Sequence, residues 1–573
     1  MNYVEGIKIG GATAAQIPSI KGTGAPTTET YGAVGCLYMN TDNGDMYKCI
    51  SDTDGVYIWE TIDGNSTRRY YYTSLSAAVA DLNAETTENA DATVETAACS
   101  LYTGANNEQV LELLADIELT ETVTITASNI KFNLNGHQIT YTGNYSLKFE
   151  GNNSMLDGRV AGSKLYAKDT NSPQIVLMTS GEIVGVHAEV VIDEVACSQS
   201  IFTASSGKVF VKDCNVNASF TYSGSSVKYE VYGILSQENA NLTIDNTTVN
   251  MSASGKIVNG GVYSKKNAGN VSVYNSIVTV NGYNCGSYGP YGIYLSGSAE
   301  QCSVCDTEVY ANRSDGGGYA FYITDCNNTI VDNIKVIGNF QVGKGTGIKF
   351  QNTNACITNS YVNAANEGIS AGSGCNAYIS QCLILGYFHS LYCVQSKECF
   401  AYVNDCTIRC KDNSNIPNCA NTNEATACVY VGYGNSTGQV VYIDGCLIES
   451  KDKIDAVDWG VVVRSDATLP TTVNLSNCII DTGLAKPIRI EDGANDNQLA
   501  AVNIGYQTVD GAGNPITKDY AADEDVDNIS DANADFLRVT NRLYRRLPDN
   551  VQATGKDYEA YYAYLMHLAD KEE

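Results

Sequence analysis

The stretch NLTIDNTTVN, residues 241–250, decides the fold of this 573-residue chain. Its apolar residues do not keep one alternation, because Ile244 stands two residues before Asn246 and Val249 stands three residues after it. The side chains of a straight strand alternate between two faces, so a straight strand cannot bury both. A left-handed residue at Asn246 turns the chain and resets the phase, and Asn, Asp and Gly tolerate that conformation. The stretch therefore predicts two strands that meet at a corner.

The same corner phrase recurs along the chain with elastic spacing, 22 to 40 residues from Asp213 onward. Its corner residues are Gly136, Asp213, Asn246, Asn275, Asp306, Asn333, Asn359, Gln381, Asp405, Gly445 and Asn477. A short unit that repeats, with insertions in its loops, predicts coils that stack into one core. We therefore expect an all-β parallel solenoid whose corner side chains bond to the copies above and below them.

A second marker precedes each corner and has the form Gly-Ile-Tyr, as at Gly261, Gly292 and Gly347 with variations. It predicts another strand in each coil, with the middle residue inward and the next residue outward. The outward residues are expected to form a stripe: Tyr263, Tyr294, Tyr322, Tyr392 and Tyr430.

Composition excludes several classes of protein. The formal net charge is 35 − 64 = −29, so a nucleic-acid backbone is not an expected partner. No apolar run reaches 18 residues, which predicts no membrane span, and the first residues do not have the pattern of a secretory signal. We expect no cofactor.

The 20 cysteines are predicted to be reduced and structural. Five of them directly follow a corner, where other coils carry Thr or Ser: Cys214, Cys382, Cys406, Cys446 and Cys478. Such a small inward position suits a free thiol, which behaves as a small buried apolar group. Cys302 and Cys305 form a lone CxxC pair without a second pair at zinc spacing, so no metal site is expected.

Four parts are expected along the chain. Residues 1–64 form an N-terminal β-hairpin module with turns at Asn43-Gly44 and Asp54-Gly55, and residues 65–108 form a helix, capped by Ser74 or Ser76, with an irregular connector. Residues 109–507 form the β-helix. Residues 508–573 form an acidic linker and short helices, which serve as an oligomerisation element or a cap.

Two stretches carry a family resemblance. EQVLELLADIELTETVTITASNIKFNLNGHQIT, residues 108–140, resembles the first coils of right-handed parallel β-helices of the pectate-lyase type. GAVGCLYMNTDNGDMYKC, residues 32–49, with the following YIWETI, resembles small modules at the start of bacteriophage tail-fibre and baseplate proteins. The resemblance implies a tail fibre or tailspike that is homotrimeric, assembles in the host cytoplasm and resides in the virion. It also implies that the N-terminal module binds a phage tail or baseplate protein. Neither stretch brings a catalytic motif.

Enzymatic cleavage of a host polysaccharide is one expected alternative. Hydrolysis needs two carboxyl groups about 5–9.5 Å apart, and neighbouring coils can supply that spacing. The candidate catalytic residues are Asp306, Glu308, Asp325 and Asp332. Lyase chemistry is less expected, because the chain has four His and its basic residues are scattered.

Binding without cleavage is the preferred interpretation. The chain has 39 Tyr against 11 Phe, and tyrosine rings offer contact area with a polar end at low conformational cost. The candidate glycan-binding residues are Tyr283, Tyr288, Tyr291, Tyr294, Tyr322, Tyr387 and Tyr392. For the tyrosines of the stripe, packing in a trimer interface is an equal alternative. We therefore expect a receptor-binding protein that adheres to a host surface glycan, with a hydrolase and a structural virion or appendage protein as alternatives.

Overall fold

The computed structural model describes residues 19–526, apart from 25, 28–29, 31–33, 42–45, 54–55, 62–68, 105–107, 225–227, 238, 286–288, 298–300, 342–343, 394–398, 411–426, 433–438, 451–458, 466–470, 477, 482–485, 493–499, 505–517 and 521–524. The chain divides into two compact units. The first holds residues 1–116 and 129–133, and the second holds residues 117–128 and 134–573. The helices predicted after residue 527 lie outside the described residues, and the domain boundaries predicted at 64, 108 and 507 stay predictions.

The first unit contains two groups of strands and a helix. In sheet A, β1 (Ser19–Gly22) pairs in parallel with β2 (Leu37–Asn40), and β2, β3 (Met46–Thr53) and β4 (Val56–Thr61) form two antiparallel hairpins, as predicted. The remaining elements are β5 (Tyr70–Tyr72), α1 (Leu75–Ala84), β6 (Cys99–Thr103), β7 (Gln109–Leu113) and β10 (Ile130–Asn133). The Ser74 side chain accepts a hydrogen bond from the Ala77 N–H, which confirms the predicted N-cap of α1.

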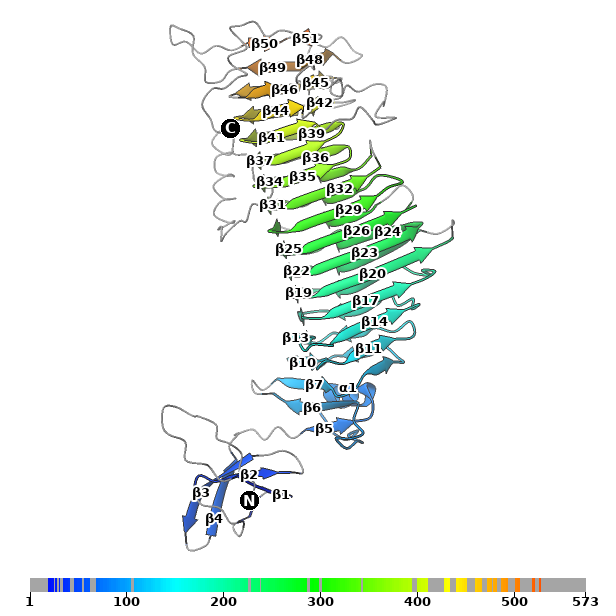
Figure 1. Cartoon of the computed structure of the whole chain (residues 1–573), viewed down its shortest axis with the longest axis vertical. Helices are drawn as coiled ribbons and strands as arrows, with labels where there is room; N and C mark the ends of the chain where they lie inside the picture. Colours follow the sequence, from blue (N-terminus) through cyan, green and yellow to red (C-terminus); the bar gives the residue numbers. More distant parts are fainter. Residues whose placement is uncertain are drawn as a thin grey trace. The chain divides into compact units, whose positions relative to one another are not determined.

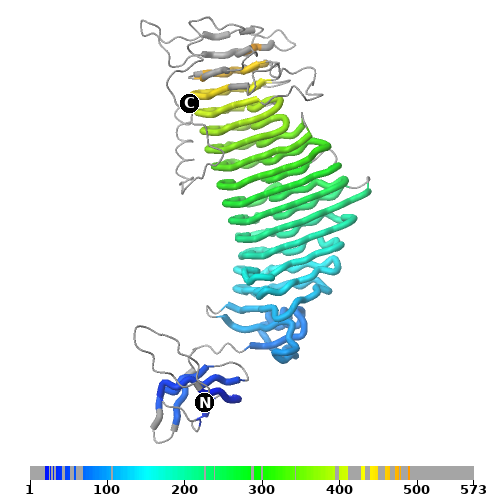
Figure 2. The backbone as a smooth tube through the Cα atoms, viewed as in Figure 1, coloured from blue at the N-terminus to red at the C-terminus, as the bar shows by residue number. Residues whose placement is uncertain are grey.

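One coil of the second unit explains the whole stack. Strand β22 (Ala240–Asp245) runs to the corner at Asn246, β23 (Thr248–Gly255) follows, and β24 (Ile257–Ser264) completes the turn. Each strand pairs in parallel with its equivalent in the next coil, so the coils build three parallel sheets named B, C and D. Figure 1 draws the sheet C strands one above another, and Figure 2 shows the chain rising coil by coil. The predicted parallel β-helix is confirmed.

Sheet B holds the strands that lead into the corner. Its strands are β13 (Ser154–Asp157), β16 (Gly181–Val184), β19 (Gly207–Lys212), β22, β25 (Val271–Tyr274), β28 (Cys302–Cys305), β31 (Asn328–Asp332), β34 (Asn354–Thr358), β37 (Asn376–Ser380), β40 (Cys399–Asn404), β43 (Gln439–Asp444), β46 (Thr471–Ser476), β49 (Ala500–Ile504) and the antiparallel β50 (Lys518–Tyr520).

Sheet C holds the strands that follow the corner. Its strands are β8 (Ile117–Leu119), β11 (Gln138–Tyr141), β14 (Lys164–Lys168), β17 (His187–Ile192), β20 (Asn215–Tyr222), β23, β26 (Ile277–Tyr283), β29 (Glu308–Arg313), β32 (Lys335–Phe340), β35 (Tyr361–Ala364), β38 (Leu383–Gly386), β41 (Thr407–Cys410), β44 (Leu447–Ser450) and β47 (Ile479–Asp481).

Sheet D holds the third strand of each coil. Its strands are β9 (Val123–Ile125), β12 (Leu147–Phe149), β15 (Gln174–Met178), β18 (Gln199–Ala204), β21 (Tyr229–Ser236), β24, β27 (Tyr291–Ser296), β30 (Tyr319–Thr324), β33 (Thr346–Gln351), β36 (Glu367–Ala371), β39 (His389–Cys393), β42 (Ala427–Val431), β45 (Trp459–Ser465), β48 (Lys486–Asp492) and the antiparallel β51 (Asp525–Val526).

The left-handed corner is present wherever the structure describes a predicted corner residue. Gly136, Asp213, Asn246, Asn275, Asp306, Asn333, Asn359, Gln381, Asp405 and Gly445 all have φ between 46° and 84°, and Asn477 lies outside the described residues. Corner amides bond along the stack, as when Asn246 Nδ2 donates to Asp213 Oδ1 at 2.6 Å. Others bond to the residue before the neighbouring corner, as when Asn275 Nδ2 donates to Asp245 Oδ1 at 2.9 Å. The predicted ladder is therefore confirmed.

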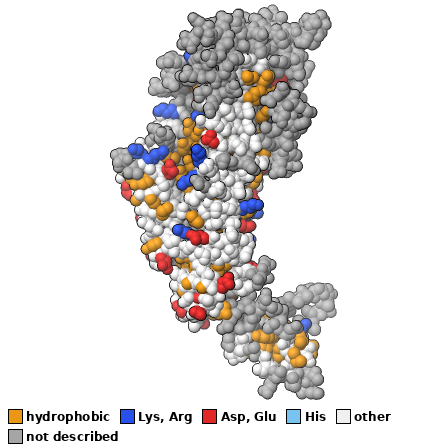
Figure 3. Space-filling model, turned by 180° about the vertical axis from the view of Figure 1, so that it is seen from behind, with side chains coloured by type: hydrophobic (Ala, Val, Ile, Leu, Met, Phe, Trp, Pro, Cys, Tyr) orange, Lys and Arg blue, Asp and Glu red, His pale blue; other side chains and the backbone are white. Residues whose placement is uncertain are grey.

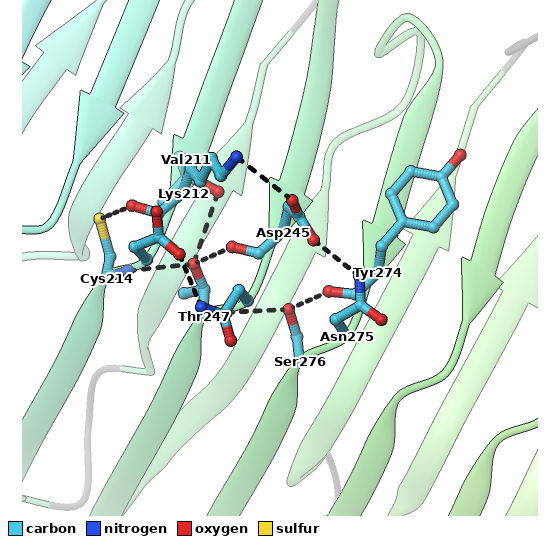
Figure 4. A network of polar contacts seen from close by, with 10 residues as sticks. Val211, Lys212, Cys214, Asp245, Thr247, Tyr274, Asn275 and Ser276 are labelled. Atoms are coloured by element: carbon cyan, nitrogen blue, oxygen red, sulfur yellow. Dashed lines mark hydrogen bonds and ion pairs between the residues drawn. The ribbon is translucent and has the colours of Figure 1, made fainter. Parts of the chain in front are cut away.

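A second ladder lies inside the corner. The Thr247 Oγ1 accepts a hydrogen bond from the Cys214 N–H and donates to the Asp245 carbonyl. In turn, the Thr247 N–H donates to Ser276 Oγ (Figure 4). Each hydroxyl thus satisfies a buried backbone N–H that the turned chain removes from the regular strand pairing. Cysteine fills the same role farther along, where the Cys382 N–H lies 3.4 Å from Cys406 Sγ.

The inner ladder predicts a difference between two substitutions of Thr247. Thr247→Val keeps the shape but leaves a buried N–H without its acceptor, so we expect the free energy of unfolding to fall by about 2 kcal/mol. Thr247→Cys retains a weak acceptor that other coils already use, and we expect it to cost less than about 1 kcal/mol. Urea unfolding of both variants measures the difference. Equal losses would contradict a role for the hydroxyl as an acceptor.

The cysteines are part of the core, as predicted. Among the residues that the structure describes no two cysteines form a disulfide, and nearly all are buried. Burial raises the pKa of the Cys382 and Cys446 thiols. These thiols therefore behave as small packing groups rather than as thiolates.

The predicted tyrosine stripe is present on the outer face of sheet D. Tyr263, Tyr294 and Tyr322 occupy equivalent positions in successive coils, and the Tyr263 and Tyr294 rings stack with their centroids 4.4 Å apart.

Figure 3 shows the face of the molecule that is turned away in Figure 1, where single charged side chains and small apolar patches lie among neutral groups. No helix in the described part of the chain is long and apolar enough to cross a membrane.

Candidate functional site: a polar groove on the outer face of sheet C

A column of asparagines marks the outer face of sheet C. Asn281, Asn312 and Asn339 occupy one position in three successive coils. Asn312 Nδ2 donates to Asn281 Oδ1 at 2.8 Å, and Asn339 Nδ2 donates to Asn312 Oδ1 at 2.9 Å. Strand alternation turns these side chains outward while Val278, Val280 and their equivalents fill the core. Asn312 and Asn339 each use one donor on the preceding amide, and all three side chains keep further hydrogen-bonding capacity for a ligand.

The polar face continues along earlier coils. Asn217 and Asn250 are paired in register, and Asn250 Nδ2 donates to Asn217 Oδ1 at 2.9 Å. These two side chains, Glu189, Ser219, Ser252 and Asn281 line an open hollow of about 340 Å³. A second hollow of about 660 Å³ also begins at Asn281 and continues past Asn312 and Asn339 to Asn363. The two hollows share Asn281 and therefore adjoin along the stack, and together they are called the groove.

Aromatic side chains border the wider end of this groove. Tyr283, which follows two residues after Asn281 on the same strand face, is 61% exposed. Tyr387 and the largely buried Phe340 line the same hollow. The Tyr387 N–H donates to the Asn366 carbonyl at 3.1 Å, which fixes the loop that carries this ring. The groove therefore combines amides with rings that have polar ends.

Arg313 closes the side of this wider hollow. Its side chain is 6% exposed, and its Nη1 donates to the carbonyls of Gly289 and Gly317 at 2.7 and 3.2 Å. Its Nε forms an ion pair with Asp315 Oδ1 at 3.2 Å. The guanidinium thus holds two loops in place, because its planar fork can bond several acceptors at once.

Of the predicted glycan-binding tyrosines, Tyr283 and Tyr387 line the groove. Tyr291, Tyr294 and Tyr322 lie instead on sheet D, where their rings pack on one another. Burial raises the pKa of Tyr322 to about 12. Tyr392 also lies on sheet D, with its ring stacked on His389 at 4.7 Å. Tyr288 lies outside the described residues. The structure thus brings two of the predicted tyrosines together and places four on another face.

The predicted catalytic carboxylates at the corner take part in the ladders. Asp306 is a left-handed corner residue and accepts from Asn333 Nδ2 at 2.7 Å. Asp332 is fully buried and accepts from Asn359 Nδ2 at 2.6 Å. Both contacts stabilise the stack, and neither residue lines the hollows described above.

The other two predicted carboxylates also have structural partners. Glu308 Oε2 lies 3.5 Å from Lys335 Nζ and accepts a hydrogen bond from the Tyr310 hydroxyl. Asp325 is a left-handed residue at the turn between sheets D and B, where it accepts from Asn352 Nδ2 at 2.9 Å. A catalytic role for the four carboxylates stays a prediction. Among the described residues, no group of three or more His, Cys, Asp and Glu side chains has the arrangement of a metal site.

Sequence reasoning missed the groove asparagines, although a signal was present. In three successive coils an asparagine stands six residues after the corner: Asn281 after Asn275, Asn312 after Asp306 and Asn339 after Asn333. Each asparagine stands an even number of residues after the first, outward residue of its strand, so alternation places its side chain on the outer face. Counting residues from the corner along the following strand would have identified these asparagines.

The fold and the groove define a class, a right-handed parallel β-helix with a polar groove on one sheet. No family model matches the chain, and no curated protein matches it. Among solved structures, that of the periplasmic alginate epimerase AlgG is 10% identical, with a TM-score of 0.30, over 69% of this chain and 84% of that chain. A single-substitution mutant of the same epimerase is 9% identical, with a TM-score of 0.31 and the same coverage. Similarity at this level carries no argument about function, which rests on the groove itself.

Proposed function

We propose that this protein binds a carbohydrate chain along the groove on sheet C. The observation that carries the proposal is the continuous column of stacked, outward asparagines that joins two open hollows at Asn281. Amides both donate and accept, as sugar hydroxyls do. A shallow groove that crosses several coils suits an extended chain better than a small molecule, which binds in an enclosed pocket.

The aromatic end of the groove supports the same ligand class. Tyr283 presents an exposed ring beside the asparagine column, and Tyr387 lines the same hollow. Tyrosine offers apolar contact area and a hydroxyl at small conformational cost. The described residues that line the two hollows include one acidic and one basic side chain, Glu189 and Arg313. Recognition in the groove would therefore use hydrogen bonds and ring contacts.

The biological setting extends the proposal. The N-terminal module resembles those of phage tail-fibre and baseplate proteins, so we propose a host surface glycan as ligand and the virion as location. The same resemblance supports a homotrimer that is joined to the tail through residues 1–64. Since each candidate catalytic carboxylate has a structural partner, we propose adhesion rather than hydrolysis.

The test is binding to panels of capsular and cell-wall polysaccharides. We expect the double variant Tyr283→Ala/Asn312→Ala to bind its best polysaccharide about tenfold more weakly than the original chain, because a ring contact and an amide are lost. Calorimetry on the polysaccharide selected from the panel measures this change.

Two matched substitutions control for general damage. Phe210 on sheet B is 43% exposed, and Asn354, also on sheet B, belongs to an amide ladder in which it accepts from Asn376. Phe210→Ala/Asn354→Ala should therefore bind as the original chain does. Equal weakening by both double variants would remove the groove from the proposal. Release of reducing ends or unsaturated products in the same panel would instead favour cleavage.

A further inference from the structure

A third hollow lies beside the groove, around the strands of sheet D. It has a volume of about 480 Å³ and is lined by glycine-rich loop residues 316–318 together with Lys344, Lys349 and Glu367. Arg313 lines both this hollow and the wide end of the groove. A ligand in the groove therefore has a second recess beside it.

The two lysines give this hollow a basic lining. Lys344 is exposed, and Lys349 is half-buried with its Nζ 5.3 Å from the centre of the Tyr319 ring and 5.8 Å from that of Tyr322. Attraction to the ring faces orients the Lys349 ammonium. Tyr319 itself lines the hollow. One lysine is therefore held in position at the hollow, and the other is accessible to solvent.

Two acidic side chains, Asp315 and Glu367, line the hollow against three basic ones, which leaves an excess of one positive charge when all are ionised. Asp315 is engaged by the buried Arg313 and also accepts from the Asn284 N–H at 2.8 Å. Glu367 accepts from Thr346 Oγ1 at 3.0 Å. Burial raises the pKa of Glu367 despite the neighbouring charge of Lys349. In a chain with a net charge of −29, this lining is locally receptive to an anion.

We propose that this hollow binds an anionic substituent, a carboxylate, sulfate or phosphate, of the carbohydrate chain that lies in the groove. The inference rests on the proposed function, because Arg313 joins the two recesses. Lys344 and Lys349 would donate charge-assisted hydrogen bonds to the anion.

The test uses small probes whose sugar part is constant: glucuronate, glucose 6-phosphate and glucose, with inorganic phosphate as a separate arm. At matched ionic strength we expect the two anionic sugars to bind more tightly than glucose and than inorganic phosphate. Lys344→Met/Lys349→Met should weaken the binding of the anionic sugars about tenfold or more, since charge-assisted hydrogen bonds are lost. The binding of glucose should not change. Calorimetry measures all four ligands up to ten millimolar.

A matched variant removes the same charge elsewhere. Lys265 and Lys266 are exposed at the turn after β24, and Lys265→Met/Lys266→Met should keep the preference for anionic sugars. Glu367→Gln should strengthen anion binding at neutral pH, because it removes the ionisable group that competes for Lys349. Misfolding does not readily explain weaker anion binding by Lys344→Met/Lys349→Met together with stronger anion binding by Glu367→Gln.

The outcomes separate the two proposals. The proposal for the hollow is wrong if no anion binds. It is also wrong if Lys344→Met/Lys349→Met and Lys265→Met/Lys266→Met lose the same affinity for the anionic sugars. Equal binding of inorganic phosphate and the anionic sugars leaves an adventitious ion only and also overturns it. If Tyr283→Ala/Asn312→Ala binds polysaccharide as the original chain does, the proposal that the groove binds a carbohydrate chain is wrong, whatever the lysine variants show.

Discussion

Replacing Gly181 by alanine is expected to lower the free energy of unfolding by about 3–5 kcal/mol, the largest effect of any single substitution considered for this chain. Gly181 begins β16 with φ of 140°, and an added Cβ would lie 1.8 Å from the Ser154 carbonyl oxygen. The atom it meets belongs to the backbone of the neighbouring coil, so no side-chain rotation relieves the overlap. Urea unfolding followed by circular dichroism measures the loss.

The control for this prediction is Gly260→Ala on sheet D. There the added Cβ would lie 3.1 Å from Tyr232 Cδ1 and 3.3 Å from Tyr263 Cδ2, so a shift of a few tenths of an ångström in these side chains would accommodate it. We expect a loss of less than about 1 kcal/mol. If the two glycine variants unfold at the same urea concentration, close backbone approach between coils does not limit the stack at Gly181.

Replacing Arg313 by methionine is expected to lower the free energy of unfolding by about 3 kcal/mol and to abolish binding in both the groove and the neighbouring hollow. The substitution leaves Asp315 without its ion-pair partner and two loop carbonyls without their donor. Arg313→Lys should recover little of the lost stability or of the lost binding, because a single ammonium group cannot replace the planar guanidinium. Unfolding and calorimetry with the selected polysaccharide measure the two losses.

An exposed ion pair supplies the comparison for Arg313. Lys335 and Glu308 have side chains that are 40% and 44% exposed, and solvent screens such pairs, so Lys335→Met should cost about 1 kcal/mol or less. It should leave polysaccharide binding unchanged. A stable Arg313→Met variant that still binds would show that the two loops keep their positions without the guanidinium.

The sequence was most informative where the backbone itself restricts the residue. At the corners, such as Asn246, only a few residue types adopt the left-handed conformation, so the repeat and the coil order could be predicted. The second marker, with its middle residue inward and the next residue outward, also predicted that Tyr263 and Tyr294 point outward and line up between coils. Both features are local and therefore readable from one stretch of chain.

The site was less predictable because it depends on contacts between coils. Outward tyrosines such as Tyr294 were predicted to bind glycan, but the sequence does not say that their rings stack on the next coil. Asp306 and Asp332 were predicted as acids because neighbouring coils bring carboxylates close together, but the same proximity supplies their amide partners. The groove needs Asn281, Asn312 and Asn339 in one register, which depends on the lengths of the loops between them.

The asparagine column gives the groove a modular length. Three successive coils each contribute one amide, and neighbouring amides bond to each other, so a further coil with an asparagine at this position would add a contact of the same kind. The reach of the groove would change by one strand spacing, about 4.8 Å. Evolution can therefore match such a surface to longer or shorter polymers by duplicating coils, without inventing a new contact.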